Sequence, residues 1–187
     1  METRALARAL LGYILVHESD DGITAGRIVE TEAYLPGDPA CHGYGGKSLR
    51  NATLFGPPHR AYVYQIYGTS YCVNLSSELD GTGAGVLVRA VEPLQGIELM
   101  QKRRGCERIR DLCRGPGRLC QALAIDRSLD GTDLFSNPNL WLASDGERSA
   151  RIRTSARIGV TKAAERRLRF YISENPYVSG AARLNPA

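Results

Sequence analysis

Short runs of β-branched and aromatic residues, separated by turn signals, dominate the first half of the chain. The runs at 13–18 and 23–34 flank the polar turn 19–22, which is the pattern of a β-hairpin. Because most runs follow one another without a long helical segment between them, they predict an antiparallel sheet rather than alternating strands and helices. Further runs of the same kind lie at 61–68, 70–76, 85–92, 139–144 and 168–173.

Helical signals are few and short. Residues 3–11 predict a helix, and prolines suited to a first helical turn predict helices that start near Pro93 and Pro116. Residues 35–60 are rich in glycine and proline and predict a long loop, and loops of that length in compact domains are usually functional. No repeat or long linker interrupts the pattern, so we expect one α+β domain over residues 1–187.

The composition is that of a globular protein in a reducing compartment. Of the 187 residues, 43% are hydrophobic and 24% are charged, which is ordinary for a soluble protein. No apolar run approaches the ~20 residues that cross a bilayer, and the N-terminus lacks a signal-peptide pattern, so we expect no membrane contact and a cytoplasmic location of the bacterial type. Five cysteines without metal-ligand spacing indicate reduced core thiols and no metal site.

The net charge of +4 conceals an uneven distribution of charge. Residues 1–99 hold 7 basic and 11 acidic side chains, whereas residues 100–187 hold 17 basic and 9 acidic ones. The excess is concentrated at 102–118 and 148–169, which we call the first and second basic segments. Such clusters suit a polyanion, because Lys and Arg that contact phosphates release condensed counterions. The alternative is that both segments form solvated helix faces.

The sequence GRIVETEAY places reactive groups on one face of a predicted strand. Side chains alternate along a strand, so Ile28, Glu30, Glu32 and Tyr34 share a face. With His42 in the loop that follows, the two carboxylates and the tyrosine form a candidate acid/base site. The alternative from these residues alone is a solvated strand face.

Tyrosines cluster in the next predicted strand and at its end. Tyr62 and Tyr64 point to one face, whereas Tyr67 has the other parity and lies beside Gly68, where the chain turns. Phenol rings stack on extruded bases, and an aromatic group at a turn can fill the gap that a flipped nucleotide leaves. The alternative is that these tyrosines pack within the sheet.

Two polar residues interrupt apolar strands. Arg89 breaks the run VLVRAV, and a buried charge needs a partner, for which Glu30 and Glu32 are the attractive candidates and Glu92 a local alternative. Asn74 interrupts YCVNL and offers both a donor and an acceptor. Together these groups predict a pocket built on strands.

The sequence contains no P-loop, dinucleotide-binding or zinc-hydrolase motif. Lys47, Lys102 and Lys162 lack the apolar flanks that activate an amine for Schiff-base chemistry. We therefore expect an activity that needs neither a cofactor nor a covalent amine intermediate.

Read in order, several segments resemble the alkyladenine DNA glycosylase family, also called 3-methyladenine DNA glycosylases. They run from about residue 10 to residue 180, so the resemblance covers nearly the whole chain. It implies a single compact domain around a curved, mostly antiparallel sheet flanked by short helices, and an enzyme that acts on double-stranded DNA containing damaged purines. We further expect a monomer. The similar segments are GRIVETEAY, PACHGYGGKSLRN, FGPP, AYVYQIYG, VLVRAVEPLQG, LCRGPGRLCQALAI, RIGV and LRFYISENPYVS.

The resemblance also implies roles for single residues. Glu32 corresponds to the general base that activates water, Glu30 to an acid without that role, and Arg89 to the arginine that helps to hold the water. The damaged base is flipped out and its glycosidic bond is hydrolysed, which leaves an abasic site. Tyr67 corresponds to the side chain that intercalates in place of the flipped nucleotide. The residues that correspond to the flipped-base pocket are Tyr34, His42, Tyr62, Tyr64 and Asn74.

The chain departs from the family pattern in two places, and neither involves the catalytic pair. Thr69 stands where relatives often have a methionine beside the intercalating residue, and the loop has Gly45 and Ser48-Leu49 where relatives often have arginine and Thr-Pro. We expect the DNA backbone to be held by cations of the loop and of the two basic segments, namely Lys47, Arg50, Arg103, Arg104, Arg118, Arg166 and Arg167.

Two other classes of protein remain open from the sequence. A non-catalytic protein that binds damaged or flipped bases would share the pocket, but it has no use for a water-activating carboxylate beside Arg89. An RNA-binding β-barrel would also explain the basic segments and the tyrosines, and it predicts tight binding of single strands without release of a base.

Overall fold

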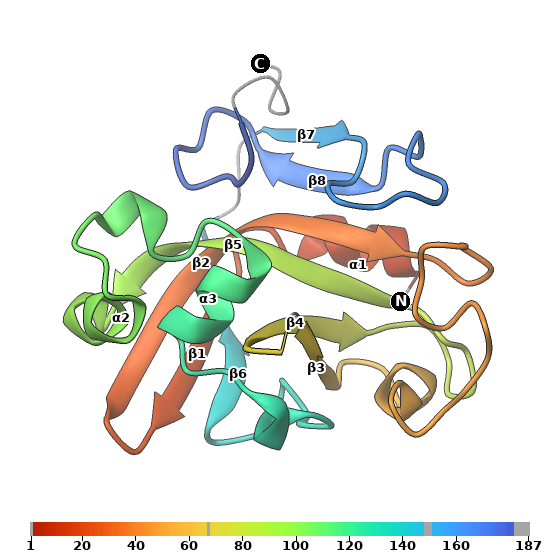
Figure 1. Ribbon diagram of the computed structural model, residues 1–187, viewed down its shortest axis with the longest axis horizontal. Coiled ribbons are helices and arrows are strands. Elements are labelled where there is room, and N and C mark those ends of the chain that lie inside the picture. Colours follow the sequence, from red (N-terminus) through yellow and green to blue (C-terminus); the bar gives the residue numbers. More distant parts are fainter. Residues whose placement is uncertain (1, 67, 148–150, 182–187) are drawn as a thin grey trace.

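A curled antiparallel sheet forms the centre of the molecule (Figure 1). The computed structural model describes residues 2–66, 68–147 and 151–181. The strands of this part of the chain are β1 (Ile14–Ser19), β2 (Gly22–Tyr34), β3 (Ala61–Ile66), β4 (Ser70–Ser76), β5 (Gly85–Gln95), β6 (Leu140–Ala143), β7 (Ile152–Ser155) and β8 (Arg169–Ile172). They form one sheet in the order β3-β4-β5-β2-β1-β6, with β8 paired to β2 and β7 paired to β8.

The length of β2 gives the sheet its curl. Residues 22–27 of β2 pair with β1 and residues 30–32 pair with β8, while β5 pairs with β2 from Ala25 to Tyr34. β2 thus exchanges one partner for another along its length, and the sheet bends where the exchange occurs. The strand pairs are antiparallel, so the predicted α+β class with a curved antiparallel sheet is confirmed.

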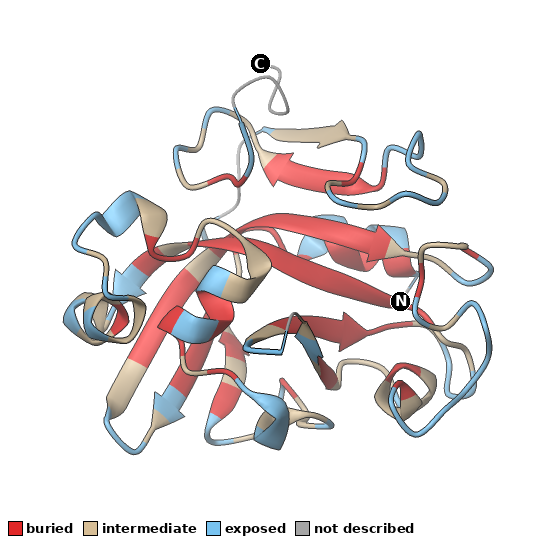
Figure 2. Cartoon of the chain, viewed as in Figure 1, coloured by how far each residue is buried: buried red, intermediate tan, exposed pale blue. Residues whose placement is uncertain are grey.

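Short helices cover parts of the sheet. They are α1 (Thr3–Ala9), α2 (Ile97–Arg104) and α3 (Pro116–Ala122), with single 3₁₀ turns η1 (Ala52–Phe55), η2 (Ile109–Asp111) and η3 (Arg127–Leu129). α1 packs against β2 and β5, and the Thr31 hydroxyl donates to the Ala7 carbonyl at 2.8 Å. α3 packs against β4 and β5. The buried faces of β2 and β5, red in Figure 2, contribute to the main hydrophobic core with Leu6, Leu15 and Leu119.

A β-bulge in β2 corrects the predicted position of Ile28. The register between β2 and β5 shifts between Ile28 and Glu30, so Val29 is left out of the pairing. Ile28 therefore packs in the main core, whereas Val29 packs with Tyr171 and Val178 in a second, smaller cluster. Strict alternation had placed Ile28 on the same face as the two glutamates, and the extra residue of the bulge breaks that alternation.

The helix predicted near Pro93 begins later in the chain. β5 continues through Pro93, which pairs with Gly26 beside a second register shift, where the missing amide hydrogen of proline is tolerated. α2 follows Gly96, whose φ is +73° and where a Cβ would lie 2.4 Å from a carbonyl oxygen of β2. Only glycine fits that turn. The helix predicted at Pro116 is confirmed, with the proline in its first turn.

The other predicted strands agree with the structure to within a few residues. The strand β7 was not predicted, because its four residues are only half-buried and carry no clear alternation. Among the helices of the described residues, none combines the length and the apolar character that a membrane span requires.

Candidate active site

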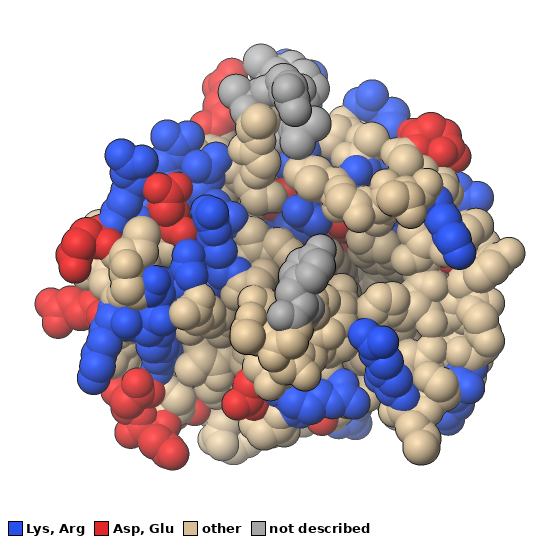
Figure 3. All heavy atoms as spheres, in the orientation of Figure 1, with Lys and Arg blue, Asp and Glu red and all other residues tan. Residues whose placement is uncertain are grey.

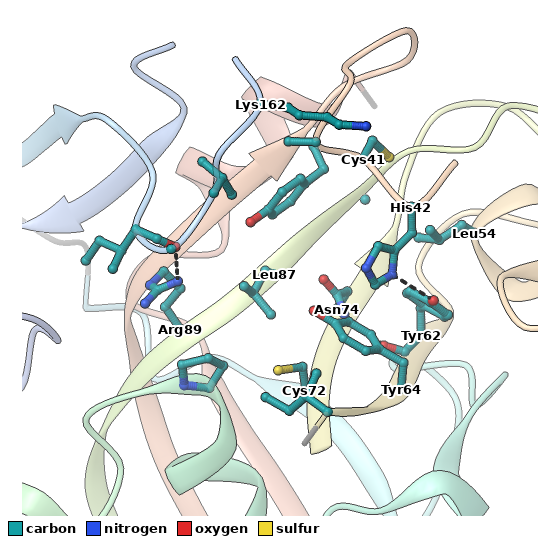
Figure 4. Close-up of a pocket in the computed structure, with 18 of the residues that line it drawn as sticks. Cys41, His42, Leu54, Tyr62, Tyr64, Cys72, Asn74, Leu87, Arg89 and Lys162 are labelled. Carbon is teal, nitrogen blue, oxygen red and sulfur yellow. Dashed lines mark hydrogen bonds between the residues drawn. The ribbon is translucent and has the colours of Figure 1, made fainter. Parts of the chain in front are cut away.

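A cavity of about 570 Å³ opens between the β3–β4 hairpin, the loop after β2 and the segment 158–162 (Figure 4). Small-molecule sites typically have volumes of this order, so the cavity is large enough for a nucleoside. Its described lining is Tyr34, Pro39, Ala40, Cys41, His42, Leu54, Tyr62, Tyr64, Ile66, Cys72, Asn74, Gly85, Leu87, Arg89, Pro116, Ile158, Gly159, Val160, Thr161 and Lys162. The five pocket residues predicted from the sequence are therefore brought together.

Glu32 is fully buried immediately behind the cavity wall. Its Oε2 accepts a hydrogen bond from the Tyr34 hydroxyl at 2.9 Å and lies 3.2 Å from Nη1 of Arg89. Its Oε1 accepts the Ile158 amide hydrogen at 2.8 Å. All three partners, Tyr34, Arg89 and Ile158, line the cavity beside the carboxylate. Tyr34, Arg89 and the Ile158 amide thus fix the carboxylate in place next to the cavity.

Tyr34 remains a hydrogen-bond donor to this carboxylate. Burial raises the pKa of Tyr34 well above its usual value, and the charge of Glu32 raises it further. The phenol therefore stays protonated at any physiological pH. Its ring forms part of the cavity wall, so Tyr34 both holds Glu32 and presents an aromatic surface to a ligand.

Arg89 connects the two glutamates of β2. Its Nε donates to Oε1 of Glu30 at 3.1 Å, and its Nη1 lies beside Glu32 and donates to the Ile158 carbonyl at 3.5 Å (Figure 4). Burial by itself would lower the pKa of Arg89, but the two carboxylates outweigh burial and raise it. The carboxylate partners predicted for Arg89 are confirmed, whereas Glu92 instead accepts a bond from Asn175.

Glu30 is fully buried like Glu32 and shares Arg89 with it, but its other partners differ. Its Oε1 accepts from Nε of Arg169 at 2.6 Å and from the Ser179 hydroxyl at 2.9 Å, and its Oε2 accepts the Ser179 amide hydrogen at 2.6 Å. The two glutamates therefore differ in environment, because Glu30 is enclosed by β8 and the segment after it. Arg169 and Ser179 were not predicted as part of the site, although both lie in the segment LRFYISENPYVS.

Aromatic rings from β3 and from the long loop after β2 form one wall of the cavity. The rings of Tyr62 and Tyr64 are stacked with centroids 5.3 Å apart, and the ring of His42 meets Tyr64 edge-on at 4.5 Å. Nδ1 of His42 lies 3.1 Å from the Tyr62 hydroxyl. Asn74 is buried beside them and donates from Nδ2 to the Tyr62 carbonyl at 3.1 Å. These groups suit stacking against a planar ligand.

An ion pair that the sequence did not predict fixes the segment beside Glu32. Arg157 donates to both carboxylate oxygens of Asp38, at 2.5 and 3.2 Å, and both side chains are fully buried. The guanidinium lies 4.7 Å from the centre of the Tyr34 ring. Because Arg157 precedes Ile158, this pair positions the backbone that holds Glu32 and Arg89.

The cations predicted to contact a DNA backbone differ in their surroundings. Arg103 donates to Asp21, Ser19 and the Ala122 carbonyl, and so ties α2 to the β1–β2 hairpin and α3. Arg104 donates to the Leu112 carbonyl and to Gln121. The other five are exposed, namely Lys47, Arg50, Arg118, Arg166 and Arg167. Figure 3 shows Lys and Arg side chains on both sides of the hollow in this face.

Tyr67, predicted to intercalate, lies outside the described residues. Within the described part of the chain, no group of three or more His, Cys, Asp or Glu side chains is arranged to hold a metal ion. The five cysteines are free thiols.

A protein-family model described as methylpurine-DNA glycosylase matches residues 1–176. Among similar proteins, one from Mesorhizobium japonicum is 54% identical over 98% of this chain and 88% of its own length. One from Methanoculleus marisnigri is 48% identical over 95% of this chain and 94% of its own length. Both carry the name "Putative 3-methyladenine DNA glycosylase".

The chain belongs to the methylpurine-DNA glycosylase family. It is therefore a hydrolase of N-glycosyl bonds in DNA, as the resemblance in its sequence implied.

Proposed function

We propose that the chain removes alkylated or deaminated purines from double-stranded DNA by flipping the damaged nucleotide into the cavity and hydrolysing its N-glycosidic bond. The lesions are of the 3-methyladenine, 7-methylguanine, hypoxanthine and etheno-adenine class. The observation that carries the proposal is the ion pair between a buried carboxylate, Glu32, and Arg89 at the wall of a cavity lined by aromatic rings. The enzyme acts as a monomer in the cytoplasm and without a cofactor.

The proposed mechanism uses the charges at this wall. A water molecule between the cavity and Glu32 loses a proton to the carboxylate and adds its oxygen to C1′ while the bond to the base breaks. Arg89 holds the water, and the Ile158 carbonyl next to Arg89 offers an acceptor. The base stacks between the rings of Tyr34, His42 and Tyr64, and Asn74 discriminates against the exocyclic amino group of normal guanine.

The charge arrangement favours an enzyme over the two alternatives. A protein that only binds a base gains nothing from burying a carboxylate against Arg89, because burying such a pair rarely adds stability. A β-barrel that binds single-stranded RNA needs an open stacking surface, whereas these rings line a recessed cavity. Both alternatives predict binding without chemical change.

The product we propose is an intact abasic site, without strand cleavage. Lys162 lines the cavity, but it is exposed, and amine nucleophiles are activated by removal from water. The test incubates the protein with duplexes that carry each lesion and reveals abasic sites by alkaline cleavage. Release of no base contradicts the proposed function. Borohydride trapping of a protein–DNA adduct contradicts hydrolysis by water alone.

Tyr67 is proposed to fill the gap that the flipped nucleotide leaves. We expect Tyr67→Ala to slow excision of paired lesions more than excision of lesions in bulges or single strands, because stacking is already lost in the latter. Single-turnover rates on matched duplex and bulged substrates measure this difference. An equal loss on both substrates assigns Tyr67 a structural role instead.

Binding of DNA is expected to depend strongly on salt. Arg118 and Arg167 are exposed, one in each basic segment, and Arg167 also donates from Nη2 to the Thr154 carbonyl. Arg118→Gln and Arg167→Gln should each flatten the log–log salt dependence of duplex affinity by about 0.9. Damaged and undamaged duplexes should weaken alike.

The matched controls for the salt experiment are Arg103→Gln and Arg104→Gln. Their guanidinium groups bond to neighbouring parts of the protein, so we expect lower thermal stability and an unchanged salt slope. If the slope changes for the controls and not for Arg118 or Arg167, the docking face has been assigned to the wrong cations.

A further inference from the structure

The charged side chains that line the described cavity are both cations. They are Arg89 and Lys162, and no carboxylate is among the described lining residues. Figure 4 places them at opposite ends, with Lys162 at the end of Cys41 and His42. Arg89 is neutralised by the two glutamates behind it. No ion pair of Lys162 occurs among the described residues, so no carboxylate there offsets its charge.

A second cation, Arg50, acts on His42. Partial burial lowers the pKa of His42, and the charge of Arg50 lowers it further, so His42 is neutral near neutral pH. Arg50 belongs to a smaller cavity that shares Tyr64 with the first. Arg157, behind the Tyr34 ring, is neutralised by Asp38. The part of the cavity beside Cys41 and His42 thus carries the positive charge of Lys162 among neutral aromatic walls.

Damaged purines differ in how they respond to positive charge. When the C1′–N bond breaks, its electron pair goes to the base, the hydroxyl of water joins C1′ and the proton of water goes to Glu32. A methylated cationic purine then leaves as a neutral molecule, whereas a neutral purine leaves as an anion until it takes up a proton from solvent. A fixed cation near the base therefore repels the cationic purine before the reaction, and it stabilises the negative charge that develops on the neutral purine during the reaction.

We infer that Lys162 is a specificity-determining residue that favours neutral damaged purines, such as hypoxanthine, over cationic methylated purines, such as 7-methylguanine. The inference rests on the proposed function, since it assumes that the cavity holds the flipped base. The aromatic walls alone do not distinguish neutral from cationic purines, because the rings stack on both. The charge of Lys162 favours the neutral ones.

The test compares Lys162→Met and Lys162→Glu with the unaltered protein. For each, the single-turnover rate divided by the half-saturating concentration is measured on duplexes with hypoxanthine and with 7-methylguanine. We expect the ratio of the hypoxanthine value to the 7-methylguanine value to fall on the order of 3- to 10-fold in Lys162→Met and further in Lys162→Glu. The change should shrink at high salt, because Lys162 is exposed.

Lys102→Met is the matched control, because Lys102 is exposed on α2 and is not among the residues that line the cavity. Its ratio should not change. An unchanged ratio in both Lys162 variants overturns the inference, as does an equal fall on the two substrates, which would mean that Lys162 holds a phosphate. If the unaltered protein releases neither base, it is the proposed function that fails.

Discussion

Glu32→Gln is expected to lower the rate of base release by about 10²- to 10⁴-fold, the range typical of a lost general base. Gln keeps the size of the side chain, and its one carbonyl oxygen can still accept the Ile158 amide hydrogen, but it cannot accept the proton of water. Binding of lesion-containing duplex should change little. Single-turnover excision and equilibrium binding, measured on the same duplex, separate the two effects.

Glu30→Gln is the control for this experiment. Glu30 faces Arg89, Arg169 and Ser179 and does not adjoin the cavity, so its loss should act through stability. Removing one partner of a buried ion pair typically costs about 3–5 kcal/mol. A Glu32→Gln protein with near-normal excision, beside a folded Glu30→Gln protein without excision, would reverse the assignment of the two carboxylates.

Asp38→Asn is expected to destabilise the protein by about 3–5 kcal/mol, because it leaves the Arg157 charge buried without its partner. The same change frees the backbone at Ile158 that holds Glu32 and Arg89, so excision should fall even at temperatures where the variant is folded. Denaturant unfolding measures the change in the free energy of unfolding. Single-turnover kinetics at low temperature measures the loss of excision in the folded variant.

Asp145→Asn provides the comparison. Asp145 pairs with Arg27 at 2.6 Å on the surface, and exposed pairs of this kind add little to stability. If both substitutions lower the free energy of unfolding equally, the Asp38–Arg157 pair does not have the structural role that its burial indicates.

The Asp38–Arg157 pair also predicts a pH dependence. Burial raises the pKa of Asp38, but the bond from Arg157 and the Ala40 amide hydrogen outweigh burial and hold it below its usual value. A carboxyl with a lowered pKa adds stability at neutral pH, and that stability is lost as the pH falls through the lowered value. Asp38→Asn should therefore remove part of the stability difference between neutral and acidic pH.

Local sequence patterns predicted most of the fold. The hairpin around residues 19–22 and the helix at Pro116 follow from turn residues and proline preferences that act within a few positions. The errors at Ile28 and Pro93 both lie beside register shifts between β2 and β5. A bulge depends on how the side chains and hydrogen bonds of two paired strands match, so the sequence of one strand alone does not predict it.

The site was predicted less completely than the fold, for a related reason. Glu32, Arg89 and the aromatic residues stand out because a charge in an apolar strand, or a group of tyrosines, is visible locally. Arg157 and Asp38 are 119 positions apart, and each looks like an ordinary surface charge in its own segment. Only the folded chain shows that they pair behind Tyr34. In the same way, only the fold shows that Arg169 and Ser179 both bond to Glu30, the partner of Arg89.

The contact between Glu30 and Ser179 joins a strand near the beginning of the chain to a segment near its end, 149 positions later. During synthesis β2 is made before Ser179. Glu30 therefore gains its two bonds from Ser179, and can hold Arg89 firmly, only after that residue has been added. A chain that ends after β8 would lack the two bonds from Ser179 to Glu30, so the partner of Arg89 would be held less firmly. The groups that hold Arg89 in place thus come together only after residue 179 has been synthesised.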